Sequence, residues 1–279
     1  MSVHDAYARL TPYELSFPNL DVARGHFSAI RNEAEVRGAD AVDPAVFLLL
    51  AATSQALREI RGVQDDPGFV HQYGLLIYHA FHFFEAGERL YFLQSTVLRR
   101  LLEDESASGS WSLVLEPAAG YVQLPQHLVW VRPGAESPPE SLDGFFWARG
   151  GADRFAVLLA LGMRTDRPGF SVVPLSDLSV AEAQDWTRMR MREDGTDFSS
   201  TLPGSEIEGL YELCSCGEAL KLVARVLRRL KTVTGTELVN AGAAPDDGPR
   251  ASALAYHVIE RCAKHAGDGG RSGRDHGRS

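Results

Sequence analysis

The run LDGFFWARGGADRFAVLLAL, residues 142–161, decides the fold that the sequence predicts. Its two halves are rich in aromatic and apolar residues, and Gly150-Gly151 separates them, as expected for two antiparallel strands joined by a turn. The second half, FAVLLAL at 155–161, is apolar at every position, which predicts a central strand covered on both faces. A helix is the competing interpretation of this half, and we favour the strand because glycine and proline turns flank it.

Similar runs extend outward from this stretch in both directions. Each is short, contains β-branched or aromatic residues and is bounded by Gly or Pro; they lie at residues 111–115, 121–124, 128–132 and 170–175. Together with the central pair, these runs predict an antiparallel meander. Beyond the meander, Ser179 and Glu182 have the spacing of a capping box that begins a helix, and a leucine-rich helix is expected over 207–232.

The residues before the meander have helical spacing. Four apolar residues recur on one face of a first helix: Ala23, Phe27, Ile30 and Ala34. Gly38 follows them at a position that suits a C-cap. Asp-Pro pairs at 43–44 and 66–67 each supply an N-cap and a first-turn proline, so each predicts the start of a further helix. The second of these is expected to continue as an aromatic helix or helix pair over 73–102.

From Gly235 the composition turns to Gly, Ala, Asp and Arg, so a mostly disordered tail is expected, with a helix considered only at residues 251–264. The sequence therefore predicts an α+β protein in three parts. An N-terminal helical region, 1–105, forms a layer against a central antiparallel β-meander with its closing C-terminal helices, 111–234, and the disordered tail is 235–279.

Composition limits the function classes. The chain has 279 residues, of which 44% are hydrophobic and 23% charged, so it can bury a substantial core. The formal net charge of −9 argues against nucleic acid as a partner, because phosphates bind basic surfaces. The apolar windows are too short to span a bilayer and the N-terminus lacks a signal-peptide pattern, so we expect no membrane partner. With 3 cysteines, too few for a disulfide framework, a cytoplasmic location is expected.

Residue chemistry gives no sign of an enzyme. There is no Gly-x-Ser-x-Gly elbow and no glycine-rich phosphate loop, so we expect no catalytic residue and no cofactor. The alternative that stays open is an enzyme with a non-contiguous, metal-dependent site near His79 and His82, with His71 in the same sector of the helix. Packed core histidines are the simpler interpretation, because i, i+3 spacing suits two ligands less well than i, i+4.

Cations gather on the last predicted helix, at Arg225, Arg228, Arg229 and Lys231. Such a patch could bind RNA or an acidic peptide. Cations near a helix C-terminus also interact favourably with the helix dipole, and we favour that structural interpretation.

A better binding hypothesis comes from two predicted strands. Alternation places Trp130 and Arg132 on one face of the run 128–132, and it places Trp147 and Arg149 on one face of the following run. If the two runs form a symmetric hairpin, Trp130 lies opposite Trp147 with an arginine near each end. That composition is typical of a peptide-binding hot spot. A core position for both tryptophans is the alternative.

Several short motifs follow one another along the chain. They are Leu124-Pro125, Val129-Trp130-Val131, Gly144-Phe145-Phe146-Trp147-Ala148, Val173-Pro174, Ser179-Val180-Ala181-Glu182-Ala183 with Asp185-Trp186, and the leucine-rich helix around 210–214. In this order, residues 113–230 resemble the larger inhibitor family of type V-A CRISPR systems and its bacterial relatives. The resemblance implies a non-enzymatic protein that recognises the nascent N-terminal segment of the CRISPR nuclease during translation and represses its production.

From the residues and this resemblance together, we expect a cytoplasmic, non-enzymatic protein-binding or regulatory module. Its partner would be a protein or a nascent peptide, and ribosome association would accompany the second case. The predicted binding residues are the two tryptophans and two arginines of the hairpin hypothesis.

Overall fold

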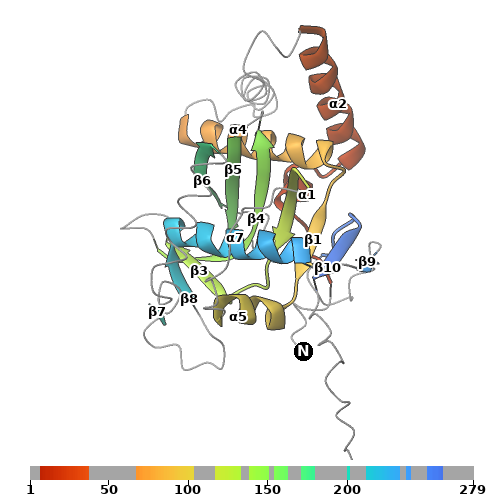
Figure 1. The fold of residues 1–279 in the computed structure, drawn as a ribbon. Coiled ribbons are helices and arrows are strands. Elements are labelled where there is room, and N and C mark those ends of the chain that lie inside the picture. The colour runs from red at the N-terminus through yellow and green to blue at the C-terminus, as the bar shows by residue number, and fades with distance from the viewer. Residues whose placement is uncertain are drawn as a thin grey trace, which may run out of the picture.

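The computed structural model describes residues 7–37, 67–103, 117–132, 138–150, 154–162, 171–179, 200–201, 212–232, 237–239 and 250–259 (Figure 1). The helices are α1 (Pro12–Ser16), α2 (Leu20–Arg37), α4 (Pro67–Glu85), α5 (Ser95–Glu103) and α7 (Cys216–Thr232). The strands are β1 (Leu90–Leu93), β2 (Ala119–Gln123), β3 (Val129–Arg132), β4 (Glu140–Gly150), β5 (Arg154–Leu161), β6 (Ser171–Ser179), β7 (Ser200–Thr201), β8 (Glu212–Ser215), β9 (Glu237–Val239) and β10 (Tyr256–Ile259). The predicted α+β class is confirmed.

The sheet is built around β4. Along most of its length β4 pairs antiparallel with β5, and β5 pairs antiparallel with β6. The other edge of β4 is shared, because its first residues pair with β3 and residues 144–148 pair with β2. The β2 branch continues through β1, β10 and β9, and the β3 branch continues through β8 and β7. β4 therefore joins two branches of one sheet.

The antiparallel runs that the sequence predicts are found in the structure. Five of them correspond to β2, β3, β4, β5 and β6, and the run at 111–115 lies outside the described residues. The succession β2, β4, β5 and β6 is antiparallel at every step. The structure adds parallel pairs that were not predicted, namely β1 with β2, β1 with β10, and β3 with β8.

The FAVLLAL run is confirmed as a strand, β5, covered on both faces. Odd-numbered residues from Phe155 to Leu161 enter a core shared with α5 and α7. Leu158 and Ala160 enter a second core shared with α1, α2 and α4. Helices therefore cover both faces of the central strands, with α4 on one side and α7 on the other (Figure 1).

A bulge in β4 changes which face its residues occupy. The register shifts between Leu142 and Gly144, so Leu142 enters the same core as Phe145. Gly144 lies against β2, and a Cβ at this position would collide with the Tyr121 hydroxyl and the Val122 carbonyl oxygen. Glycine is therefore required here by the close approach of two strands.

Four segments differ from the sequence prediction. Residues 90–93, expected in a helix, form β1, and residues 212–215, expected in the last helix, form β8. Residues 256–259, considered as part of a helix, form β10, and residues 237–239 of the expected tail form β9. Each of these strands is short and pairs with a strand far along the sequence or with another unexpected strand. Tertiary pairing has thus overridden the local pattern.

Two of the described helices agree with the prediction. α4 begins at the predicted Pro67, and α2 buries Ala23, Phe27 and Ile30 on the predicted face, whereas α7 begins at Cys216 instead of residue 207. The helices expected from residue 44 and after Ser179 lie outside the described residues, while Ser179 itself ends β6. None of the described helices combines the length and the apolarity needed to cross a membrane.

Candidate functional site

β3 presents two different faces. Val129 and Val131 are fully buried in the core shared with α5 and α7, whereas Trp130 is partly exposed and Arg132 is exposed. The ring of His127 lies beside that of Trp130, with 5.9 Å between the ring centroids and 31° between the planes. We call His127, Trp130 and Arg132 the β3 surface.

The backbone holds His127 in this place. Its φ of 63° lies in the left-handed region, which histidine adopts more readily than most residues. Its N–H donates to Oγ of Ser141 at 3.0 Å. Ser141 lies opposite Trp130 in the β3–β4 register. The turn before β3 is therefore bonded to β4, and this bond keeps the two rings together.

The predicted pairing of the two tryptophans is wrong. β3 pairs with the first residues of β4, where Trp130 lies opposite Ser141. Trp147 lies farther along β4, opposite Gly120 of β2 and Val157 of β5. Trp130 is closer in sequence to Ser141 than to Trp147, so the observed register closes a shorter loop than the symmetric hairpin would. Closing a shorter loop costs less chain entropy.

Trp147 is a core residue. It is 1% exposed, and its Nε1 donates to the carbonyl oxygen of Pro117 at 3.1 Å. Its ring covers Gly120, where a Cβ would collide with it. Arg149 is exposed near the other end of β4. The structure thus brings only Trp130 and Arg132 together among the four predicted residues, and binding by Trp130, Arg132 and Arg149 stays a prediction.

α4 carries two histidines that the sequence singled out, of which His79 is buried and His82 is partly exposed. His79 is 3% exposed and lies near Phe146, with 6.3 Å between ring centroids. Burial, and secondarily the charge of His82, lowers the pKa of His79 to about 3. Burial lowers the pKa of His82 to about 4. Within the described part of the chain, Nδ1 of His79 and Nε2 of His82 have no hydrogen-bond partner. Both rings are therefore neutral at neutral pH.

These histidines do not form the core of a recognisable metal site. Among the residues that the structure describes, no group of three or more His, Cys, Asp or Glu side chains is arranged to hold a metal ion. His71 belongs to α4, but its side chain lies outside the described part. The alternative of a metal-dependent enzyme at His79 and His82 gains no support.

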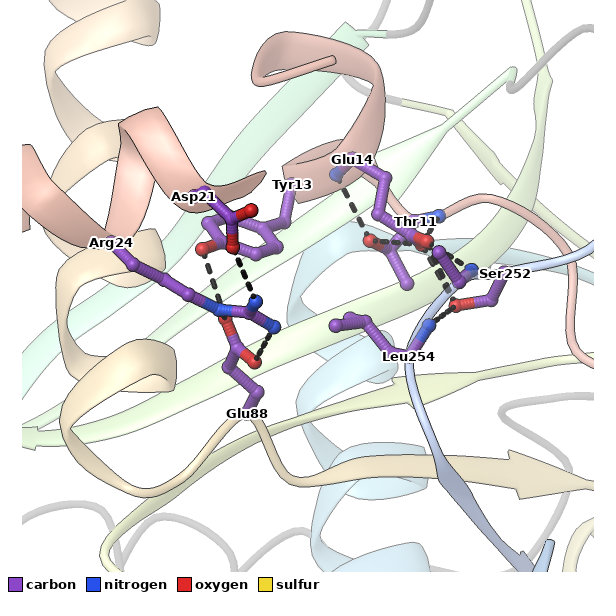
Figure 2. Close-up of polar contacts among 9 residues, drawn as sticks. Thr11, Tyr13, Glu14, Asp21, Arg24, Glu88, Ser252 and Leu254 are labelled. Atoms are coloured by element: carbon purple, nitrogen blue, oxygen red, sulfur yellow. Dashed lines mark hydrogen bonds and ion pairs between the residues drawn. The ribbon is translucent and has the colours of Figure 1, made fainter. Parts of the chain in front are cut away.

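A buried carboxylate, which the sequence analysis missed, joins two distant segments. Glu14 of α1 is 6% exposed. Its Oε2 accepts from the N–H of Thr11 at 2.8 Å and from Oγ1 of Thr11 at 2.9 Å, completing a capping box. Oγ of Ser252 donates to the same oxygen at 2.9 Å, and the N–H of Ala253 donates to Oε1 at 2.6 Å. Figure 2 shows the carboxylate between Thr11 and Ser252.

Backbone bonds extend this contact. The N–H of Leu10 donates to the Arg250 carbonyl at 3.1 Å, and the N–H of Ser252 donates to the Ala8 carbonyl at 2.9 Å. The N–H of Arg9 donates to the Gln123 side chain at 2.7 Å, which fixes the same segment to β2. We call residues 7–16 together with 250–254 the terminal clamp. Within it, Glu14 is bonded to Thr11, Ser252 and Ala253, as most buried polar groups are bonded in folded proteins.

A second carboxylate holds the first two helices. Glu88 follows α4 with a left-handed φ of 53°. It accepts from the Tyr13 hydroxyl at 3.0 Å and from Nε and Nη2 of Arg24 at 2.9 and 2.6 Å (Figure 2). Burial, followed by the charge of Glu88, raises the pKa of Tyr13 well above its ordinary value. Glu88 therefore links α1 and α2 to the turn before β1.

Glu88→Gln is expected to lower the free energy of unfolding by about 1 kcal/mol, because one charged acceptor for Arg24 is lost. Arg24 is 40% exposed, so solvent screens part of the attraction. Urea unfolding followed by circular dichroism measures the change. The control is Asp21→Asn, which alters an Arg24 contact made by a side chain that is 92% exposed. It should change stability by less than about 0.5 kcal/mol, and equal losses in the two variants would contradict the assignment.

One cation of the predicted basic patch has a structural role. Arg225 is 7% exposed, and its Nη1 donates to the carbonyl oxygens of Leu101 at 2.7 Å and Leu102 at 3.1 Å. These carbonyls lie in the last turn of α5, where they have no helical donor. Arg225 therefore fixes α7 to α5, in agreement with the structural interpretation of this patch.

Comparison with known proteins finds a remote structural likeness. No protein-family model matches the chain, and no curated protein matches it. A solved structure titled "Crystal structure of AcrVA2", an anti-CRISPR protein, is similar with a TM-score of 0.43 and 14% sequence identity, over 82% of this chain and 69% of that chain. The resemblance that the sequence predicts is therefore present in a remote form, which does not place the chain in a family.

Proposed function

We propose that this chain is a non-enzymatic protein-binding module that takes a polypeptide segment on the β3 surface. The observation that carries the proposal is the grouping of Trp130 with the ring of His127 and with Arg132 on one face of β3. Tryptophan and arginine are the residues most enriched where protein interfaces gain their binding energy. The histidine ring adds a second flat surface beside the indole.

The strand that carries this surface is held firmly. β3 pairs with β4 on one edge and with β8 on the other. Its opposite face is anchored by Val129 and Val131, both 0% exposed. Because the backbone under Trp130 is already ordered, a partner that packs on the indole pays little additional entropy on binding.

The non-enzymatic part of the proposal is supported by the roles of the buried polar groups. Glu14, Glu88 and Arg225 each bond segments of the fold together. His79 and His82 are both on α4, where His79 lies near the ring of Phe146 and His82 near the ring of Tyr78. The hydroxyls of Thr11 and Ser252 that donate to Glu14 are 0% and 2% exposed, so they are buried inside the terminal clamp.

The finer identity of the partner comes from the sequence resemblance of residues 113–230. It favours a nascent polypeptide on the ribosome, and specifically the N-terminal segment of a CRISPR nuclease whose production is repressed. This proposal adds ribosome association to the β3-surface proposal and can fail independently of it.

The test compares three forms of the full chain as affinity baits in lysate of the native host. They are the wild type, the double variant Trp130→Ala/Arg132→Ala, and the control Arg99→Ala, which changes an exposed arginine of α5. A polypeptide captured by wild type and control is then purified and its Kd measured. We expect the double variant to bind it at least about tenfold more weakly, with unchanged circular dichroism.

Two outcomes would overturn the proposal. A purified partner that binds the double variant as tightly as the wild type would show that the β3 surface is not used. Turnover of a substrate by the purified chain would contradict a non-enzymatic function. Puromycin, which releases nascent chains, tests the finer proposal, because ribosomal proteins should then leave the captured complex.

A further inference from the structure

A second group of aromatic and basic side chains lies on β1 and β10. Tyr91 and His257 are opposite each other in the parallel register of these strands. Their rings are stacked, with 5.2 Å between centroids and 25° between planes. Tyr91 also lies 5.8 Å from the ring of Trp147, so the stack rests on the core. His257 is partly exposed at the outer side of the stack.

Arg89 lies on the same face as this stack. Its carbonyl oxygen accepts from the N–H of Tyr121 at 3.0 Å, so Arg89 continues the β1–β2 ladder. Alternation along the strand then places it on the face of Tyr91, two residues on. Burial lowers the pKa of His257, and the Arg89 guanidinium lowers it further. Because Tyr91 lies opposite His257, Arg89, two residues before Tyr91, is a diagonal neighbour of His257 across the two strands.

The guanidinium of Arg89 is exposed and makes no hydrogen bond or ion pair within the described part of the chain. An exposed guanidinium without a bond, beside a stacked pair of rings, offers a partner a charged donor and a flat surface on one face. Arginine binds carboxylates through two parallel N–H donors.

We propose that Arg89, Tyr91 and His257 form a second binding site, which takes a carboxylate side chain of an acidic polypeptide. This site is separate from the β3 surface: β1 and β10 lie on one branch of the sheet and β3 and β8 on the other, toward different ends of the sheet in Figure 1. The acidic chain, with its net charge of −9, repels an extended polyanion such as nucleic acid over its whole surface. A short acidic segment is repelled less, because fewer of its charges face the rest of the surface, and Arg89 attracts it locally.

The test uses the purified full chain and a fluorescent hexaglutamate peptide, with hexaglutamine as the uncharged comparison. Fluorescence anisotropy at low ionic strength measures the Kd. We expect hexaglutamate to bind the wild type and hexaglutamine not to bind. Arg89→Ala should weaken hexaglutamate binding about tenfold, since a charge-assisted bond to the ligand is lost. His257→Gln should weaken it less, and the control Arg99→Ala, on α5 beyond the other end of β1, should leave it unchanged.

The possible failures are distinguishable from those of the β3 surface. Equal weakening by Arg99→Ala and Arg89→Ala would show that the peptide senses only overall charge. Loss of hexaglutamate binding in Trp130→Ala but not in Arg89→Ala would assign the acidic peptide to the β3 surface. No binding to the wild type would overturn the proposal, as would tighter Arg89-dependent binding of a single-stranded oligonucleotide than of hexaglutamate.

Discussion

Replacing Glu14 with alanine is expected to lower the free energy of unfolding by about 3–5 kcal/mol. The carboxylate accepts from two groups of Thr11, from the hydroxyl of Ser252 and from the N–H of Ala253. Without it, the donors of Thr11 and Ser252 stay buried and lose this acceptor, and each lost partner in a buried place costs about 1–3 kcal/mol. Urea unfolding at pH 7, followed by circular dichroism, measures the loss.

Two further variants define the origin of this effect. Glu14→Gln keeps the size of the side chain and one acceptor oxygen, so an intermediate loss is expected. Glu35→Ala removes an exposed carboxylate of α2 and should change stability by no more than about 0.5 kcal/mol. A loss below about 1 kcal/mol for Glu14→Ala would show that water or rearrangement satisfies the terminal clamp without its carboxylate.

Acidification is expected to destabilise the fold strongly between pH 6.5 and pH 4. The pKa values of His79 and His82 are lowered to about 3 and about 4 by burial, whereas both histidines titrate near 6.5 in the unfolded chain. In this window the unfolded chain binds protons that the folded chain excludes. The free energy of unfolding therefore keeps its full value above pH 6.5. As the pH falls below 6.5, it decreases by about 1.4 kcal/mol per pH unit for each histidine.

Denaturant titrations at several pH values measure this dependence, and variants separate the histidines from the carboxylates that titrate in the same range. His79→Leu places an apolar side chain next to Phe146. It should reduce the slope of the free energy of unfolding against pH by the amount that corresponds to about one proton. The double variant His79→Leu/His82→Leu should reduce it by about two. The control Val36→Leu, at a position of α2 that is 86% exposed, removes no titrating group and should leave the slope unchanged. Identical slopes in wild type and double variant would contradict the prediction.

The part of the fold that could be predicted is the part encoded locally. β5 was predictable because its seven consecutive apolar residues fit a strand that is covered on both faces. The turn signals on both sides of the run favoured this strand over a helix. β1 could not be predicted in this way. It has four residues between two helices, and it is a strand because it pairs with β2 on one edge and β10 on the other. Neither partner is visible in the local pattern.

The same distinction applies to the candidate sites. Alternation correctly placed Trp130 and Arg132 on one side of β3. The register with β4 was wrong because β2 occupies the rest of that edge, and alternation does not encode competition between strands. Thr11 and Glu14 have the spacing of a capping box, a local signal that was available but not used. Ser252 lies 238 residues from Glu14, so no local signal could join them.

The position of β10 has a consequence for the order in which the protein is made. β10 lies between β1 and β9 in the sheet, yet it emerges from the ribosome long after β1. At about 5–20 residues per second, β1 waits roughly ten to thirty seconds for its neighbour. During that time its outer edge exposes unpaired backbone groups that can pair with another chain. The pairing of β1 with β10 is therefore a late step in the formation of this sheet, and slow synthesis lengthens the time for which the edge of β1 is exposed to other chains.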